Sequence, residues 1–193
     1  MNNPQDITVL EKLTNTLEGL NIAYAIGGSM ASSAYGIARF TQDADITVEP
    51  FDSVSNSLFD SLKNEFYISK DAMLQALKNR TSFNVIHLAS AFKIDIFVRK
   101  ETAFQIQMFA HSRKLQLGNL QKKQIFVSPE DVILLKLDWY KQSDCVSDRQ
   151  WSDIIGVLSV QKNSLDYKYL KTWSANLGLN DLLQKAISES NNL

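Results

Sequence analysis

The sequence lacks several features that mark specialised classes of protein. Its 193 residues contain a single cysteine, Cys145, so the chain cannot form an internal disulfide. No apolar run approaches the roughly 20 residues that span a membrane. Residues 1–6 lack the charged-then-apolar layout of a signal peptide. We therefore expect a cytoplasmic protein that has no membrane partner.

A strong excess of charge of either sign is also missing. The formal net charge is −1 at pH 7, which argues against a protein that coats nucleic acid indiscriminately. Residues 93–123 are an exception, because seven basic residues there stand against two acidic ones. This segment could meet a polyanionic acceptor such as RNA. We favour a solvated hairpin and helix face, because no aromatic stacking pattern interleaves these charges.

The composition is that of an ordinary globular protein. Hydrophobic residues make up 45% of the chain and charged residues 21%. The length suits one substantial domain, or a core with a small appendage. We expect a core over residues 1–127 and a C-terminal helical region over residues 128–193, because the pattern after residue 127 is helical throughout.

Residues 23–48 carry the most informative pattern. A short apolar strand over residues 23–26 ends at Gly27 and Gly28, which allow a tight turn and a close approach to a ligand. Ser29 is predicted to be the N-cap of a helix. The Gly28 and Ser29 amides would then form a phosphate site at a helix N-terminus. Taken alone, the same residues could be only a strand-to-helix turn.

Two carboxylates stand at the start of the next predicted strand, over residues 44–48, one just before its first residue and one within it. Residues two apart face the same side of a strand, so Asp43 and Asp45 would lie together. Such a pair repels and suits a hard divalent cation. On their own, both could be exposed loop acids. A phosphate cradle beside a cation seat points to phosphoryl chemistry.

The combination of Gly28-Ser29, a spacer and Asp-Ala-Asp at residues 43–45 resembles the signature of the nucleotidyltransferase superfamily, the DNA polymerase beta-like fold. The third carboxylate of that superfamily comes from a later strand, and Asp95 stands within the apolar residues 92–98. The resemblance covers about the first hundred residues. It implies an α+β fold, in which a mixed β-sheet is flanked by helices and followed by a C-terminal helical segment.

The remaining periodicity predicts further elements. Apolar spacing indicates helices over residues 6–18, 71–78 and 102–110, and a helix whose stripe runs from Val54 to Phe66. Hairpins are expected over residues 83–98 and, around Gly118-Asn119, over residues 114–127. Further helices are predicted near residues 148–155, 165–177 and 181–189. The three tryptophans, Trp139, Trp151 and Trp173, are expected to pack between the C-terminal helices. Both histidines, His87 and His111, are expected to be structural.

The motif Ser-Pro-Glu-Asp at residues 128–131 has the N-cap, proline and acidic residues of a helix start. The helix that follows, with Lys136 and the later Asp153, resembles the C-terminal part of the nucleotidyltransferase toxins of abortive-infection type IV systems. In those toxins a lysine and an aspartate at such positions complete the active-site motifs. The alternative is that Lys136 and Asp153 are solvated helix positions.

The resemblance implies a role for each candidate residue. Asp43, Asp45 and Asp95 would hold two Mg²⁺ ions, or Mn²⁺, and Asp95 would help to accept the acceptor's proton. Gly28, Ser29 and Lys136 would bind the donor's phosphates. Arg39 would either touch phosphate or pair with a carboxylate.

The implied reaction transfers a nucleoside monophosphate from an NTP, with ATP or CTP as the expected donor, to a hydroxyl on RNA, a protein or a small molecule. One alternative is a non-catalytic member of the fold that binds a nucleotide or a partner, such as the cognate antitoxin of a toxin-antitoxin pair or a second copy. Another is a purely structural metal cluster.

Overall fold

The computed structural model describes residues 4–118, 120 and 122–191. Within these residues a seven-stranded mixed sheet has the order β3-β4-β5-β2-β1-β7-β6. The pairs β2 with β5 and β1 with β7 are parallel, and the other neighbours are antiparallel. The strands are β1 (Tyr24–Ile26), β2 (Asp43–Val48), β3 (Phe66–Ile68), β4 (Ser82–His87), β5 (Lys93–Val98), β6 (Arg113–Leu115) and β7 (Gln124–Phe126).

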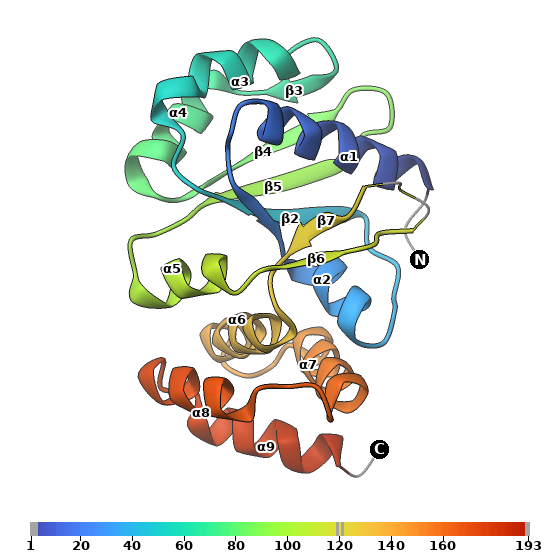
Figure 1. The fold of residues 1–193 in the computed structure, drawn as a ribbon, viewed down its shortest axis with the longest axis vertical. Coiled ribbons are helices and arrows are strands. Elements are labelled where there is room, and N and C mark those ends of the chain that lie inside the picture. Colours follow the sequence, from blue (N-terminus) through green and yellow to red (C-terminus); the bar gives the residue numbers. More distant parts are fainter. Residues whose placement is uncertain (1–3, 119, 121, 192–193) are drawn as a thin grey trace.

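Helices cover the sheet from both sides (Figure 1). On one side lie α1 (Pro4–Gly19), α3 (Ser55–Leu62) and α4 (Lys70–Asn79). On the other lie α2 (Gly28–Tyr35), α5 (Ala103–Ala110) and the C-terminal helices, which are α6 (Pro129–Gln142), α7 (Asp148–Gln161), α8 (Tyr167–Asn176) and α9 (Asn180–Ser190). The structure therefore has the α+β architecture that the sequence predicts. None of the described helices combines the length and the apolar character needed to cross a membrane.

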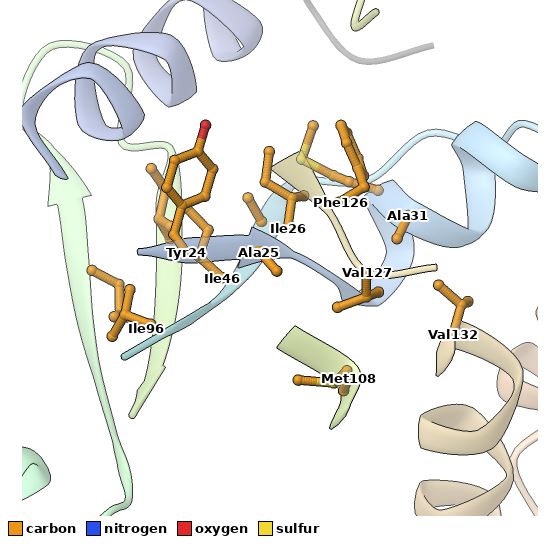
Figure 2. Close-up of a cluster of buried hydrophobic side chains, with 14 of the residues drawn as sticks. Tyr24, Ala25, Ile26, Ala31, Ile46, Ile96, Met108, Phe126, Val127 and Val132 are labelled. Carbon is orange, nitrogen blue, oxygen red and sulfur yellow. The ribbon is translucent and has the colours of Figure 1, made fainter. Parts of the chain in front are cut away.

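The two central strands alternate strictly between buried and partly exposed residues. Ala44, Ile46 and Val48 of β2 are buried, as are the matching apolar residues of β5. Figure 2 shows Ile46 and Ile96 in the same apolar cluster as Tyr24 of β1. Since successive side chains point to opposite faces, this burial turns the acidic residues of both strands toward the other face.

The predicted helix through Phe66 is wrong at its end. The helix α3 stops at Leu62, and Phe66 begins β3, where it pairs with His87 of β4. Phe66 continues an apolar stripe with helical spacing, but pairing to β4 satisfies its backbone and buries the same ring at the edge of the sheet. The two predicted hairpins are confirmed. Asn119, part of the predicted second turn, lies outside the described residues.

Buried polar contacts join the start of α6 to the core. The Ser128 hydroxyl accepts a hydrogen bond from the Asp131 amide at 3.1 Å and donates one to the Asp131 carboxylate at 2.6 Å. Asp131 also accepts the Tyr169 hydroxyl at 2.7 Å. Glu130 accepts a hydrogen bond from Arg113 at 3.1 Å. The first turn of α6 is thus held by both the sheet and α8.

Candidate active site

The turn between β1 and α2 is packed directly against β2. Gly27 donates its amide to the Asp45 carbonyl oxygen at 2.8 Å. Gly28 has a φ of +53°, and a Cβ atom there would lie 1.7 Å from Asp45 Oδ2. The Ser29 amide hydrogen-bonds the Asp45 carboxylate. Only glycine fits at position 28, because both the backbone angle and the space exclude a side chain.

The predicted N-cap at Ser29 is wrong. The helix α2 begins at Gly28, with Gly27 as its N-cap and no side-chain cap. Ser29 is the second residue of this helix, and its hydroxyl accepts a hydrogen bond from Arg39 at 2.5 Å. The hydroxyl therefore lies in the first helical turn, beside the amides that the sequence analysis assigned to phosphate.

Three carboxylates project from the same face of β2 and β5. Asp43 and Asp45 are two apart on β2, and the parallel register places Asp95 directly opposite Asp45. Burial, followed by the charges of Asp43 and Asp95, raises the pKa of Asp45 to about 6. The Asp43 carboxylate accepts a hydrogen bond from the Thr41 hydroxyl at 2.8 Å. Asp95 forms an ion pair with Lys93 at 2.7 Å.

A buried ionic network stands behind the glycine turn. Lys136 Nζ lies 2.8 Å from Asp153 and 2.9 Å from Gln150 Oε1. Arg39 donates two hydrogen bonds to Asp153, at 2.8 and 2.9 Å, and a third to Ser29. Of the two roles considered for Arg39, the structure shows the carboxylate pairing.

The solvated interpretation of Lys136 and Asp153 is wrong, because they are only 5% and 8% exposed. Burial alone would raise the pKa of Asp153, but hydrogen bonds from Arg39 and Lys136 outweigh it and lower that pKa. Burial lowers the pKa of Lys136, against the opposing effect of Asp153. Lys136 and Asp153 have reached the interior as an ion pair, the form in which such residues are usually buried.

A cavity of about 470 Å³ opens beside these groups. Gly28, Ser29, Asp45 and Lys136 line it together, while Asp43 and Lys93 line a separate hollow. Trp139 also lines the cavity and is 56% exposed, so its predicted packing between the C-terminal helices is wrong. Val132 and Lys136 also line the cavity. Lys136 follows Val132 by four residues and precedes Trp139 by three, so all three lie on the same face of α6.

The carboxylate face fits a hard cation by its chemistry. It offers oxygen ligands only. Burial, and then repulsion from Asp43 and Asp95, raises the pKa of Asp45, and a bound divalent cation would relieve that repulsion. As they stand, no three histidine, cysteine, aspartate or glutamate side chains among the described residues are grouped closely enough to hold a metal. Asp45 contacts the Ser29 amide and Asp95 contacts Lys93, so cation binding would have to release these contacts.

Gln150 and Gln105 are among the cavity-lining residues that the sequence did not single out. Gln150 bonds Lys136 and lies three residues before Asp153, a spacing that places both on one face of α7. That spacing was a usable signal. Gln105 of α5 also lines the cavity, and no pattern in the sequence connects it with the glycine turn.

Comparisons with known proteins show what fold this chain shares. No protein-family model and no curated sequence matches it. Among solved structures, the antibiotic-resistance factor ANT(2'')-Ia in solution is 13% identical, with a TM-score of 0.60 over 94% of this chain and 95% of that one. Its crystal structure with adenylyl-2''-tobramycin gives 16% identity and 0.58, over 90% and 97% of the two chains.

Two further proteins are similar. An antigenic nucleotidyltransferase-like protein from Paracoccidioides brasiliensis is 18% identical, with a TM-score of 0.55 over 94% of this chain and 91% of that one. A putative nucleotidyltransferase from Thermotoga maritima is 15% identical, with a TM-score of 0.52 over 79% and 96%. At these identities the similarity shows the nucleotidyltransferase-like fold alone.

Proposed function

We propose that this chain is a magnesium-dependent nucleotidyltransferase that moves a nucleoside monophosphate from an NTP to a hydroxyl acceptor. The observation that supports this most is the lining of one cavity by the glycine turn, the carboxylate of Asp45 and the buried ammonium of Lys136. The fold that this chain shares with ANT(2'')-Ia also supports this proposed function. The cavity volume of about 470 Å³ suits a small ligand.

The donor's phosphates would bind at the start of α2. The Gly28 and Ser29 amides, the Ser29 hydroxyl and the Lys136 ammonium supply hydrogen-bond donors and positive charge there. Arg39 holds the Ser29 hydroxyl, and Asp153 holds Arg39 and Lys136. Asp153 is therefore a positioning residue, which fixes two cations at the turn before the triphosphate arrives.

Asp43, Asp45 and Asp95 would hold the magnesium ions. When bound, Mg²⁺ neutralises charge on the phosphates and lowers the pKa of the acceptor hydroxyl. The three carboxylates would fix these ions on the shared face of β2 and β5.

In the transfer step the acceptor oxygen forms a bond to the α-phosphorus. The bond between that phosphorus and the oxygen bridging to the β-phosphorus breaks, and pyrophosphate leaves with the bonding electron pair. The Asp95 carboxylate accepts the proton of the acceptor hydroxyl. Lys136 stabilises the negative charge that collects on the departing pyrophosphate.

We favour a small hydroxylated molecule as the acceptor. Four of the seven basic residues in the segment 93–123 are paired with acidic side chains and do not form a free basic strip; these pairs are Lys93 with Asp95, Arg99 with Glu49, Arg113 with Glu130, and Lys122 with Glu18. RNA binding depends on unpaired positive charge. RNA, a protein side chain and a role in a toxin-antitoxin pair are kept as outcomes of the acceptor experiment.

That experiment uses α-labelled NTPs with magnesium and three acceptor pools, namely small metabolites, total RNA and total protein. Label should appear in a product of one pool. Asp43→Asn and Asp95→Asn should each abolish it, while Asp60→Asn, an exposed change on α3, should leave it intact. Label transfer that survives in both site variants would overturn the assignment.

A further inference from the structure

Trp139 is unusual among the three tryptophans. The other two are partly buried, Trp151 against Tyr140 at 4.9 Å and Trp173 against Phe104 at 5.3 Å between ring centroids. Trp139 is 56% exposed and lines the 470 Å³ cavity. What sets Trp139 apart is that its exposed indole lines the cavity, where a bound ligand can cover it.

The position of Trp139 relative to the phosphate site is set by α6. Lys136 and Trp139 are three residues apart, so both point from the same face and are separated by about 4.5 Å along the axis. A ligand whose phosphates bind at Lys136 and the glycine turn would extend along this face and reach the indole next. In an NTP, the group that follows the phosphates and sugar is a flat aromatic base.

The cavity that Trp139 lines has the mixed character that a nucleobase needs. Phe97 of β5, Met108 of α5 and Leu135 of α6 supply apolar surface, and Gln105 and Gln142 supply amide groups that can donate or accept hydrogen bonds. A purine or pyrimidine has an apolar face and a polar edge. Aromatic side chains stack on any such face, whichever base it is.

We propose that Trp139 is the stacking platform for the base of the bound NTP. This inference rests on the proposed function and adds to it the direction in which the donor lies, with the triphosphate at Gly28, Ser29 and Lys136 and the base against α6 beyond Lys136. The indole is then a binding residue for the donor, and the acceptor approaches from the side of Asp43 and Asp95.

The test compares two probes, the tightest-binding of ATP, GTP, CTP and UTP, and inorganic triphosphate, by calorimetric titration with magnesium. Trp139→Ala should raise the Kd for the NTP by about tenfold and leave the Kd for triphosphate unchanged. Trp139→Phe, which keeps an aromatic face, should restore most of the NTP affinity. Trp173→Phe, a change away from the cavity lining, is the matched control and should alter neither Kd.

Equal weakening of both probes by Trp139→Ala, or no change in either, would overturn the stacking role while leaving the proposed function standing. An unchanged NTP Kd with a raised KM for the acceptor would do the same and assign the indole to the acceptor. If the wild type binds neither probe, the proposed function fails, and this inference fails with it.

Discussion

Gly28 is the residue on which the geometry of the candidate site depends most closely. Its positive φ and its contact with the Asp45 carboxylate bring a backbone turn and an acid together with no side chain between them. Gly27, one residue earlier, has a φ of −123° and open space where a Cβ would stand. The two neighbouring glycines therefore differ sharply in what they tolerate.

Gly28→Ala should destabilise the protein by about 2 kcal/mol or more, because the new Cβ would force Asp45 aside and strain the backbone. Urea unfolding measures this free energy. Gly27→Ala is the matched control and should stay within about 0.5 kcal/mol of the wild type. Equal losses in the two variants would contradict the close approach described for Gly28.

Asp45 also gives the protein a pH-dependent cost. Its folded-state pKa of about 6 lies above the ordinary value of 3.8, so the folded protein binds this proton more strongly than the unfolded chain does. The contribution of Asp45 to the free energy of unfolding is at its maximum below pH 3.8 and is lost as the pH rises through 6. The carboxylate is kept charged at neutral pH at the expense of stability, as functional groups often are.

Asp45→Asn should therefore stabilise the metal-free protein at pH 8, by roughly 3 kcal/mol, and have little effect near pH 4. Chemical unfolding at both pH values in the presence of a chelator measures the difference. A stabilisation that is the same at both pH values would show that the charge on the buried Asp45 carboxylate is not its cause.

At the scale of elements, the start of α6 holds the C-terminal helices to the core. The Asp131 carboxylate is fully buried and accepts hydrogen bonds from Ser128 and Tyr169, with His111 at 3.2 Å. Burial raises its pKa, and those hydrogen bonds oppose the rise. The His111 ring packs against Tyr169 with centroids 4.4 Å apart, so three elements meet at one acid. Since α6 also carries Lys136, this anchor helps to fix the cavity wall.

Tyr169→Phe removes one donor from that buried carboxylate and should cost about 1–3 kcal/mol of unfolding free energy. Guanidinium unfolding provides the measurement. Tyr167→Phe, which loses only an exposed hydroxyl bonded to the Lys162 carbonyl oxygen, is the control and should have almost no effect. Similar values for the two variants would mean that Asp131 does not depend on Tyr169.

The sequence predicted elements best where the pattern is local. The two-residue spacing of Asp43 and Asp45 predicted the acidic face of β2, and the cap at Ser128 predicted the start of α6. The prediction from the sequence failed at Phe66. Its spacing from Leu62 is that of a helix, but Phe66 belongs to a strand that forms by pairing with His87. Trp139 was also misjudged, because an apolar residue on an amphipathic helix gives no local sign that its face lines a cavity.

At the scale of the whole molecule, the candidate site is assembled from distant parts of the chain. Arg39 and Asp153 are 114 residues apart, and their pairing depends on α7 packing against α2. Gly36 makes this packing close, since a Cβ there would lie 2.7 Å from the Val157 backbone nitrogen. No local pattern encodes such a contact, so the sequence offered Arg39 two roles and could not decide between them.

The central claim is that an NTP and magnesium bind together at the carboxylate face and the glycine turn. Thermal unfolding with each NTP, with magnesium or with a chelator, tests this without knowledge of the acceptor. A ligand at 100 times its Kd adds about 2.7 kcal/mol, which corresponds to roughly 5–10 °C. The same scans on Asp43→Asn and on the surface control Asp60→Asn separate site binding from general effects.

The account predicts that at least one NTP raises the midpoint of the wild type and of Asp60→Asn only when magnesium is present, and that Asp43→Asn loses most of this shift. A midpoint that no NTP moves at millimolar concentration, or a shift that Asp43→Asn retains in full, would contradict it.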